Sequence, residues 1–438
     1  MLHDRIGNAA CELFMNAEVA GKIAAMPSVS TSSSPAPVST PHPSTGTARH
    51  ALVLGLLTAV GPFAIDMYLP ALPALTRALH ADAHGAQASL MSFFFALGAG
   101  QLIAGPLSDR FGRKRPLYLG LLVFGLASIG CALAPSLEVL VVLRFVQGLG
   151  ACAAMVTPRA VVRDLYTGPD AARLMASLLT VYSVSPILAP LAGSAVASAF
   201  GWRGVFAALC ALAVAALAMV AWLLEETRPA PARRTGGWRT AVDGYRTLLA
   251  DRQFLALALI ASCAVGCFFV YVANSAFVMT AHYGVSPRSY ALLFALNALA
   301  LIGVSRFNAR LVARFGLRCL LRGAVATQAA LMLALLLMQL AGVDALAGLV
   351  LLLMAGFGLN GLIVPSAFVL AMERHAGLAG AASALLGTAN FAGGALVMAA
   401  VSPFADGTPL PMVAGIAACS AIALTTALYR LGATGPTP

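Results

Sequence analysis

The sequence GPLSDRFGRKR, at residues 105–115, returns in partial form as NARLVARFGLR at residues 308–318. The two segments share the tripeptide Arg-Phe-Gly, at residues 110–112 and 314–316. Each segment lies in a short polar connection between the second and third long apolar stretches of its own half of the chain. Because both copies have the same place and direction, they predict two similar halves related by an axis along the membrane normal, a repeat found in transporters.

The composition of the chain excludes a water-soluble globule. Of 438 residues, 60% are hydrophobic and only 10% are charged, with a mean hydropathy of +0.88, whereas soluble domains carry about 25% charged residues. The eight cysteines are scattered, mostly inside apolar runs, without a CxxC motif or a Cys/His cluster. Neither a disulfide framework nor a metal site is indicated, and the bilayer is the expected solvent.

Twelve stretches reach or approach the roughly 20 mostly apolar residues that a transmembrane helix requires. They are residues 51–75, 83–108, 116–137, 137–158, 174–202, 204–224, 253–287, 289–308, 323–343, 345–372, 375–405 and 407–429. We therefore predict an all-α integral membrane protein with twelve transmembrane helices, arranged as two six-helix halves related by a pseudo-twofold axis.

Changes in composition divide the chain into five predicted parts. They are a disordered N-terminal tail at 1–48, an N-terminal six-helix half at 49–225, a cytoplasmic linker at 226–252, a C-terminal six-helix half at 253–431 and a C-terminal tail at 432–438. The first tail is predicted to be disordered because residues 27–47 are rich in Ser, Thr and Pro and nearly free of bulky apolar residues.

The net charge of +11 is best explained by topology. If the N-terminus is inside, the outer loops contain only Arg77, Arg203 and Arg288, and nearly all other cations fall on the cytoplasmic side. Cytoplasmic loops retain Lys and Arg, so this bias predicts that both termini are cytoplasmic. The same cations favour contact with anionic inner-leaflet lipid. Since topology accounts for nearly all of the cations, the positive charge gives no separate indication of nucleic-acid binding.

Two charged residues lie well inside predicted spans. Asp66 is the only acid at such depth, where its charged form is costly and a function in proton transfer is the default interpretation. At about 1.5 Å per residue, Asp66 lies roughly 14 Å and Arg144 roughly 10 Å below the outer surface, so the two could interact. The alternatives are a structural partner that neutralises Asp66 permanently and backbone carbonyls that satisfy Arg144.

Several motifs, together with GPLSDRFGRKR, resemble the major facilitator superfamily and, within it, the drug:proton antiporters of the bicyclomycin/chloramphenicol-resistance (Bcr/CflA) type. The resemblance covers about residues 51–430. The motifs are AIDMYLPALP at 64–73, LRFVQGLG at 143–150, SPILAPLAG at 185–193, GWR at 201–203 and GAASALLG at 380–387.

This resemblance implies a coupling mechanism and a conformational latch. Asp66 would carry the proton, Arg144 would tune or compete for it, and Gln147 would be a hydrogen-bonding partner. The latch would release when the transporter changes to its inward-facing state. In the second copy, Ala313 stands in place of Asp109, the acid of the latch. Plain positive-inside anchoring explains the cations of the first copy but not its acid or its glycines, which would provide close approach and the turn. The latch residues are Gly105, Asp109, Arg110, Gly112, Arg113 and Lys114.

The resemblance also identifies Pro186, Pro190 and Gly193 in the fifth span as an antiporter motif that kinks the helix and seals the interface between halves. Polar and aromatic residues in both halves are candidates for an amphipathic substrate cavity, although each alone is also compatible with ordinary helix packing. These candidates are Tyr68, Phe95, Gln147, Tyr271, Asn274, Phe277, Asn297, Asn360 and Asn390.

The predicted function is proton-coupled export of small amphipathic compounds by alternating access, as in multidrug or antibiotic efflux. Export of a native metabolite, such as an amino acid or a siderophore-like compound, is the alternative; a membrane-embedded enzyme is more distant because His282 and His375 are isolated at span ends. No GxxxxGK[ST] loop supports ATP drive, and we expect no cofactor and no metal. The expected partners are a small-molecule substrate, protons and lipids, without nucleic acid, for a monomer in a bacterial inner membrane.

Overall fold

The structure is a computed structural model that describes residues 45–228 and 238–431. The predicted tail at 432–438 and most of the predicted tail at 1–48 lie outside the described residues. The boundary at residue 48 was wrong by a few residues, because the first described helix already begins at Thr45.

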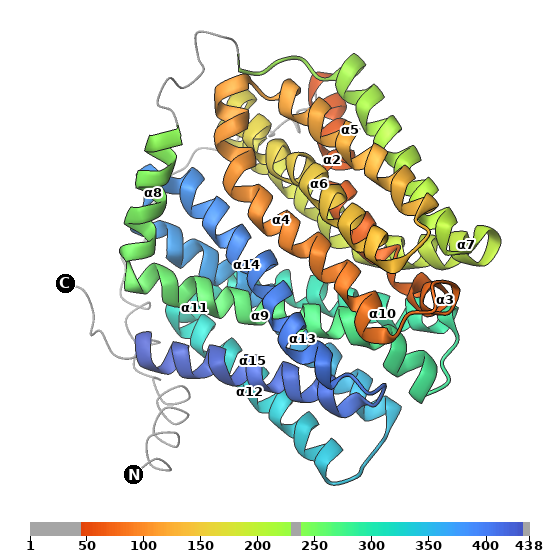
Figure 1. Ribbon diagram of the computed structural model, residues 1–438. Helices are drawn as coiled ribbons and strands as arrows, with labels where there is room; N and C mark the ends of the chain where they lie inside the picture. Colours follow the sequence, from red (N-terminus) through yellow and green to blue (C-terminus); the bar gives the residue numbers. More distant parts are fainter. Residues whose placement is uncertain (1–44, 229–237, 432–438) are drawn as a thin grey trace, which may run out of the picture. The chain divides into compact units, whose positions relative to one another are not determined.

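The helices of the first half follow one another along the chain (Figure 1). They are α2 (Thr45–Asp66), continued by η3 (Leu69–Ala71) and α3 (Leu72–Ala78), then α4 (Ala83–Phe111), α5 (Lys114–Leu133), α6 (Leu137–Leu165) and the double-length α7 (Gly168–Leu223). The predicted linker contains a helix, α8 (Trp238–Ala250).

The second half repeats this plan. It consists of α9 (Arg252–Phe277) with η5 (Val278–His282), α10 (Pro287–Ser305), the short α11 (Asn308–Phe315), α12 (Leu317–Leu340), α13 (Leu346–Glu373), η6 (Ala376–Leu378), α14 (Ala379–Val401) with η7 (Ser402–Phe404), and α15 (Pro409–Arg430).

Eleven helices within the described residues are long and apolar enough to cross a membrane. One of them, Arg173–Leu223, contains 51 residues, far more than the roughly 20 that one crossing needs. It is broken at Gly201, whose φ of 70° and ψ of 179° are not helical. The two parts of α7 are the fifth and sixth spans, so the structure has the twelve crossings that the sequence predicts.

Helices from the two halves pack directly against each other. In Figure 1, α4 lies beside α14, and α7 also contacts α10. Small residues permit the α4–α14 approach: a Cβ on Gly98 would lie 2.6 Å from the backbone nitrogen of Ala392, and a Cβ on Gly387 would overlap the side chain of Gln101. In a membrane, close packing of small residues is a main source of helix association.

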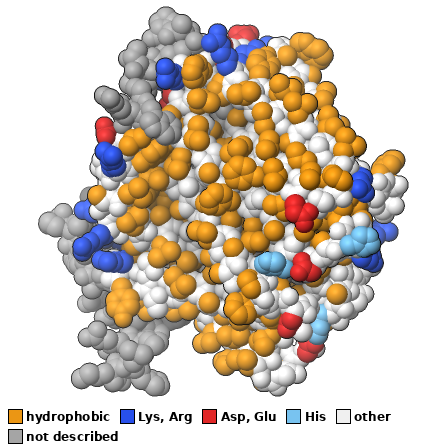
Figure 2. Space-filling model, viewed as in Figure 1, with side chains coloured by type: hydrophobic (Ala, Val, Ile, Leu, Met, Phe, Trp, Pro, Cys, Tyr) orange, Lys and Arg blue, Asp and Glu red, His pale blue; other side chains and the backbone are white. Residues whose placement is uncertain are grey.

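Successive crossings end at two opposite faces of the bundle. We name the face where α2 begins the N face; α4 and α15 end there and α9 begins there. The other is the far face, which carries α3 and the connection from η5 to α10. Figure 2 shows hydrophobic side chains over most of the visible surface, with cations mainly toward its edges and several acids and histidines in its lower right part.

The repeated Arg-Phe-Gly segment takes the same backbone conformation in both halves. Gly112 has φ 89° and ψ 174°, and Gly316 has φ 76° and ψ 154°. This region is almost restricted to glycine. The two copies differ in what precedes the turn, because α4 continues unbroken to Phe111 whereas the second half has a break after Ser305 and then α11.

The linker helix α8 contacts both halves at the N face. The hydroxyl of Tyr245 donates to the backbone oxygen of Leu102 on α4 at 2.9 Å. That oxygen is free because Pro106 has no N–H to return the usual helical hydrogen bond. On the other side of α8, Gly244 lies near Ala381 of α14. The segment that was predicted only as a linker therefore bridges α4 and α14.

We expect Gly112→Ala and Gly316→Ala each to reduce the free energy of unfolding by about 1–3 kcal/mol, because alanine disfavours this backbone region. Thermal unfolding of the purified protein measures the effect. Gly105→Ala is the matched control, since Gly105 is helical and a Cβ there meets no atom within 4 Å. Equal losses in all three variants would show that the positive φ is not the cause.

Candidate functional site

Asp66 is the last residue of α2, where the first spanning segment changes into the short turn η3. Pro62 within α2 and Pro70 in η3 interrupt the regular hydrogen bonding of this segment. The Asp66 side chain is only 4% exposed, and it makes no hydrogen bond to another described residue. The turn η3, just after Asp66, contacts α7 of the first half and both α9 and α10 of the second half, so the acid lies near the place where helices of both halves meet.

Arg144 on α6 is completely buried. Its Nη1 donates to the backbone oxygen of Ala64 at 3.2 Å and to Oε1 of Gln147 at 2.6 Å. Gln147 Nε2 in turn donates to Ser128 on α5 at 2.7 Å. Arg144 Nε and Nη2 have no hydrogen-bond partner among the described residues, which leaves donors in reserve at the centre of the first half.

Aromatic rings surround the Arg144 guanidinium. Its central carbon lies 4.2 Å from the ring centre of Phe93 and 4.8 Å from that of Tyr68, distances at which cations are attracted to aromatic faces. Arg144 therefore contacts the chain on both sides of Asp66: it donates to the carbonyl of Ala64 and lies against the ring of Tyr68. Arg144 and Asp66 form no ion pair in the described structure.

The three residues of the predicted antiporter motif lie in the first part of α7, which packs against α2. Pro186 and Pro190 are inside this helix. Gly193 lies so close to α2 that an added Cβ would overlap the backbone oxygen of Met67. The glycine thus sets the separation of α7 from the residue that follows Asp66.

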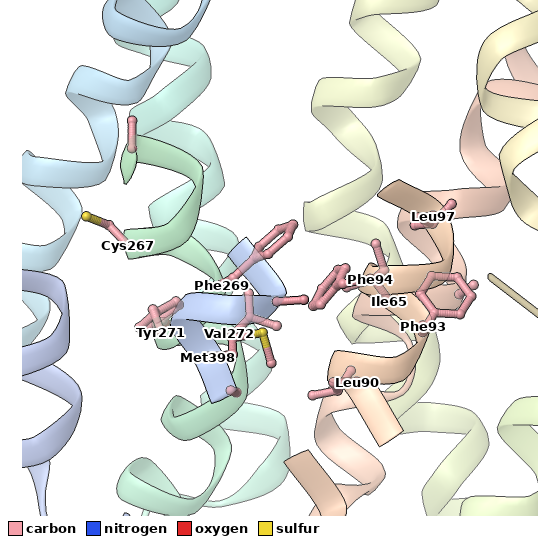
Figure 3. Close-up of a cluster of buried hydrophobic side chains, with 14 of the residues drawn as sticks. Ile65, Leu90, Phe93, Phe94, Leu97, Cys267, Phe269, Tyr271, Val272 and Met398 are labelled. Carbon is pink, nitrogen blue, oxygen red and sulfur yellow. The ribbon is translucent and has the colours of Figure 1, made fainter. Parts of the chain in front are cut away.

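An aromatic contact joins the halves in the interior. Figure 3 shows Phe94 of α4 directed toward Phe269 of α9. Their rings are stacked with centres 3.9 Å apart, and Phe391 of α14 lies 5.7 Å from Phe269. Phe95, chosen from the sequence for the cavity wall, is 46% exposed, because one step along a helix turns a side chain by about 100° from its neighbour. Its place in a cavity stays a prediction.

Most of the other predicted wall residues in the second half have polar partners or are buried. Tyr271 and Asn297 are hydrogen-bonded at 2.9 Å. Asn360 bonds to Gln328 of α12 and to a carbonyl of α9, so it ties helices of one half together. Asn390 is buried with its Oδ1 unpaired, and Phe277 is partly buried against the core.

A chain of hydrogen bonds connects the halves near the far face. His84 of α4 contacts Ser402 Oγ at 2.6 Å, Ser402 donates to Gln87 Oε1 at 2.6 Å, and Gln87 Nε2 donates to Asn274 Oδ1 at 3.0 Å. We call these four residues the far-face clasp. Asn274, predicted as a wall residue, therefore belongs to a contact that holds α4 against α9 and η7.

The predicted latch is an ionic network at the N face. Asp109 Oδ1 accepts hydrogen bonds from Arg113 at 2.9 Å and Arg228 at 2.6 Å. Arg113, only 3% exposed, also binds both carboxylate oxygens of Asp164 on α6, at 2.7 and 3.2 Å. Burial opposes the charged guanidinium, but the hydrogen bonds and charges of Asp164 and Asp109 outweigh it and raise the Arg113 pKa.

Glu226 completes this network. Its carboxylate accepts from the backbone N–H groups of Arg113 at 2.8 Å and Lys114 at 3.2 Å, at the start of α5. A carboxylate is favourable at a helix N-terminus because free N–H groups and the helix dipole are positive there. The network thus joins α4, α5, α6 and the chain after α7 within one half.

Three other latch residues have simpler surroundings. Arg110 and Lys114 stack over Phe111 and Tyr118, and Gly112 forms the turn. The close approach predicted for Gly105 is not observed, since a Cβ there would meet no atom within 4 Å. Close packing on α4 occurs instead at Gly98.

Sequence inspection missed Asp164, Glu226 and Arg228 as latch partners, and His84, Gln87 and Ser402 as clasp residues. An acid beside a cation at the end of α6 was a usable signal for Asp164. The clasp residues gave none, because isolated polar residues in apolar helices do not reveal their partners. Among the described residues, no cluster of three or more His, Cys, Asp or Glu side chains could hold a metal ion.

Two repeated six-helix halves, joined by an interior aromatic contact and containing a buried acid at their junction, define a multi-pass membrane transporter. The family model of the Major Facilitator Superfamily matches residues 54–398. The chain belongs to this superfamily.

Similar proteins agree with this assignment. The chain is 37% identical over 375 residues to the uncharacterized MFS-type transporter YdgK of Bacillus subtilis (strain 168), with 85% of this chain and 93% of that protein covered. It is 30% identical over 388 residues to the bicyclomycin resistance protein homolog of Haemophilus influenzae, covering 85% and 94%. A bacterial homolog of the human lysosomal transporter Spinster has the same fold, with a TM-score of 0.66 at 16% identity, covering 90% and 98%.

We expect Asp164→Asn to reduce the free energy of unfolding by about 1.5–3 kcal/mol, because the buried Arg113 cation loses its bidentate charged partner and keeps only Asp109. Asp170→Asn is the control, since the Asp170–Arg173 pair is more than 60% exposed on both sides and such pairs contribute about 0–1 kcal/mol. Thermal unfolding in detergent measures both. Similar effects for the two variants would contradict a structural role for the latch.

We expect Gly193→Ala to impair transport while Gly303→Ala does not. The first Cβ overlaps the backbone of Met67, whereas the second meets no atom within 4 Å. Displacing α7 from α2 moves the backbone beside Asp66, and displacements of this kind cost about 10²-fold in well-positioned sites. Initial transport rates in vesicles, normalised to protein amount, test this, and unchanged rates for Gly193→Ala would refute it.

Proposed function

We propose that the protein is a proton-coupled antiporter that exports small amphipathic compounds, with Asp66 as the proton carrier. The observation that carries this proposal is the buried Asp66 carboxyl group, without a hydrogen bond among the described residues, between helices of both halves. A relative named for bicyclomycin resistance supports antibiotics as one class of exported compound.

The orientation belongs to the same proposal: the N face is cytoplasmic, so that both ends of the chain are cytoplasmic in a bacterial inner membrane. The far-face connections hold few cations, namely Arg77, Arg203 and Arg288. The N-face connections hold many, including the cations of the latch and of α11. Cytoplasmic loops show this excess of Lys and Arg.

Coupling follows from the cost of burying charge. Protonated Asp66 is neutral and compatible with its dry surroundings, whereas an ionised and unpaired carboxylate there is costly. Arg144 binds the backbone carbonyl of Ala64, two residues before Asp66, and its Nε and Nη2 are unpaired among the described residues. A small rearrangement that directs these donors at Asp66 would stabilise its ionised form and release the proton. A substrate whose binding directs these donors at Asp66 would therefore favour proton release, and protonation of Asp66 would disfavour that substrate.

The contacts between halves support alternating access. The far-face clasp and the stacked Phe94–Phe269 pair hold the halves together toward the far face, so outward opening requires both to separate. The aromatic rings freed by this separation would provide apolar surface for a substrate, and the polar groups of Gln87 and Asn274 would provide hydrogen bonds. Such a surface fits compounds with both apolar and polar parts.

The energy source is proposed to be the proton gradient rather than a bound cofactor. One intramembrane carboxylate supports exchange of one compound for about one proton, driven by roughly 2.3 kcal/mol per charge per 100 mV together with the pH difference. Coupling between binding sites is reciprocal. A substrate whose binding favours proton release must therefore bind more weakly, by the same factor, when Asp66 is protonated.

We expect Asp66→Asn to abolish proton-driven transport of dyes and antibiotics in everted vesicles, because the amide cannot exchange a proton. Passive exchange of substrate across the membrane should persist. Asp243→Asn, which changes an exposed acid on α8, should transport normally. Proton coupling is measured by collapse of the imposed pH difference on addition of substrate.

Proton coupling that survives Asp66→Asn would remove Asp66 as the carrier. Arg144→Ala separates the two roles of the arginine: loss of coupling with retained folding supports tuning of Asp66, whereas normal transport would contradict it. A deletion strain that releases less of an amino acid or a siderophore-like compound, but keeps its drug-resistance profile, would favour export of a native metabolite instead.

A further inference from the structure

A cavity of about 470 Å³ lies between α9 and α15 at the N face. Its lining consists of Arg252, Leu255, Ala256, Leu259, Thr425, Thr426, Tyr429 and Arg430. Arg252 is the first residue of α9 and Arg430 is the last of α15, so the two cations stand at the mouth of one groove. The volume is within the range of small-molecule sites.

Both cations are exposed, and neither makes an ion pair or hydrogen bond to another described residue. The acid next to Arg252 does not neutralise it. Asp251 accepts instead from the backbone of Gln253 and from His375, each at 2.7 Å. Two guanidinium groups at one groove mouth form a strong acceptor-binding pair, because each offers several donors in a planar array.

The walls of the groove below the cations are apolar and open to the lipid side. Leu255 and Leu259 are 41% and 45% exposed at successive turns of α9. Thr425 and Thr426 both donate their hydroxyl protons to the backbone oxygen of Ile422. Their oxygens therefore remain available as acceptors, next to the cations.

We propose that this groove binds an anionic phospholipid whose headgroup carries hydroxyl groups. Arg252 and Arg430 bind the phosphate, the threonine oxygens accept from the headgroup hydroxyls, and an acyl chain lies along Leu255 and Leu259. Basic pockets between transmembrane helices at the cytoplasmic side favour such headgroups. The site lies on the lipid side of the second half and is independent of proton coupling at Asp66.

Native mass spectrometry of the purified full chain tests the proposal with added dilauroyl phosphatidylglycerol. The wild type should retain this lipid more tightly than dilauroyl phosphatidylcholine. Arg252→Gln with Arg430→Gln should weaken binding about 25-fold, taking about a fivefold effect for each cation. Leu259→Trp, which keeps both cations but fills the apolar part, should also weaken binding of the diacyl lipid.

The matched control is Arg310→Gln with Arg322→Gln, which removes two cations of the same half at α11 and α12. It should retain wild-type binding, and thermal unfolding should show that both double variants are folded. Equal weakening by the control would reduce the effect to net charge and overturn the proposal. Equal affinity for phosphatidylcholine, or displacement of the lipid by glycerol phosphate at similar concentration, would also overturn it.

Discussion

The interior of the first half depends on how one buried arginine is accommodated. Arg144 is completely buried, and an arginine remains charged under all ordinary conditions. Its charge is balanced by a carbonyl of α2, a glutamine one turn along α6, and the faces of Phe93 and Tyr68. Because these partners come from α2, α4 and α6, the arginine determines how the three helices are rotated. It makes no ion pair with Asp66, although it binds a backbone carbonyl only two residues away.

The two faces of the bundle use different chemistry to hold helices together. At the N face the network of Asp109, Arg113, Asp164 and Glu226 is ionic and lies within one half. Near the far face the clasp joins the halves through neutral hydrogen bonds, and glycines allow α4 to approach α14. Neutral hydrogen bonds in membrane proteins contribute about 0.6 kcal/mol on average, so the contact between halves can separate while each half keeps its own shape.

The halves are not equivalent despite their common turn. The position of Asp109 is occupied by Ala313, and the helix before the second turn is broken into α10 and α11. The linker helix α8 adds a further asymmetry, because Tyr245 satisfies a carbonyl that Pro106 leaves free only in α4. The first half is thus the more rigidly connected at the N face. The second half instead presents the open groove between α9 and α15 there.

The sequence by itself determined the spans, the two halves, the equivalent turns at Gly112 and Gly316, and that Asp66 and Arg144 lie within spans. A helix that crosses a bilayer must be long and apolar, and the backbone conformation at these turns is almost restricted to glycine. Each of these features can therefore be recognised from a short stretch of sequence. Only the tertiary structure decided the partners of these residues: that Arg144 binds the carbonyl of Ala64, that Phe94 stacks on Phe269 between the halves, and that the predicted linker forms a bridging helix. Those pairings depend on how each helix is rotated about its axis and placed relative to its neighbours, and in uniformly apolar helices hydropathy carries almost no information about either.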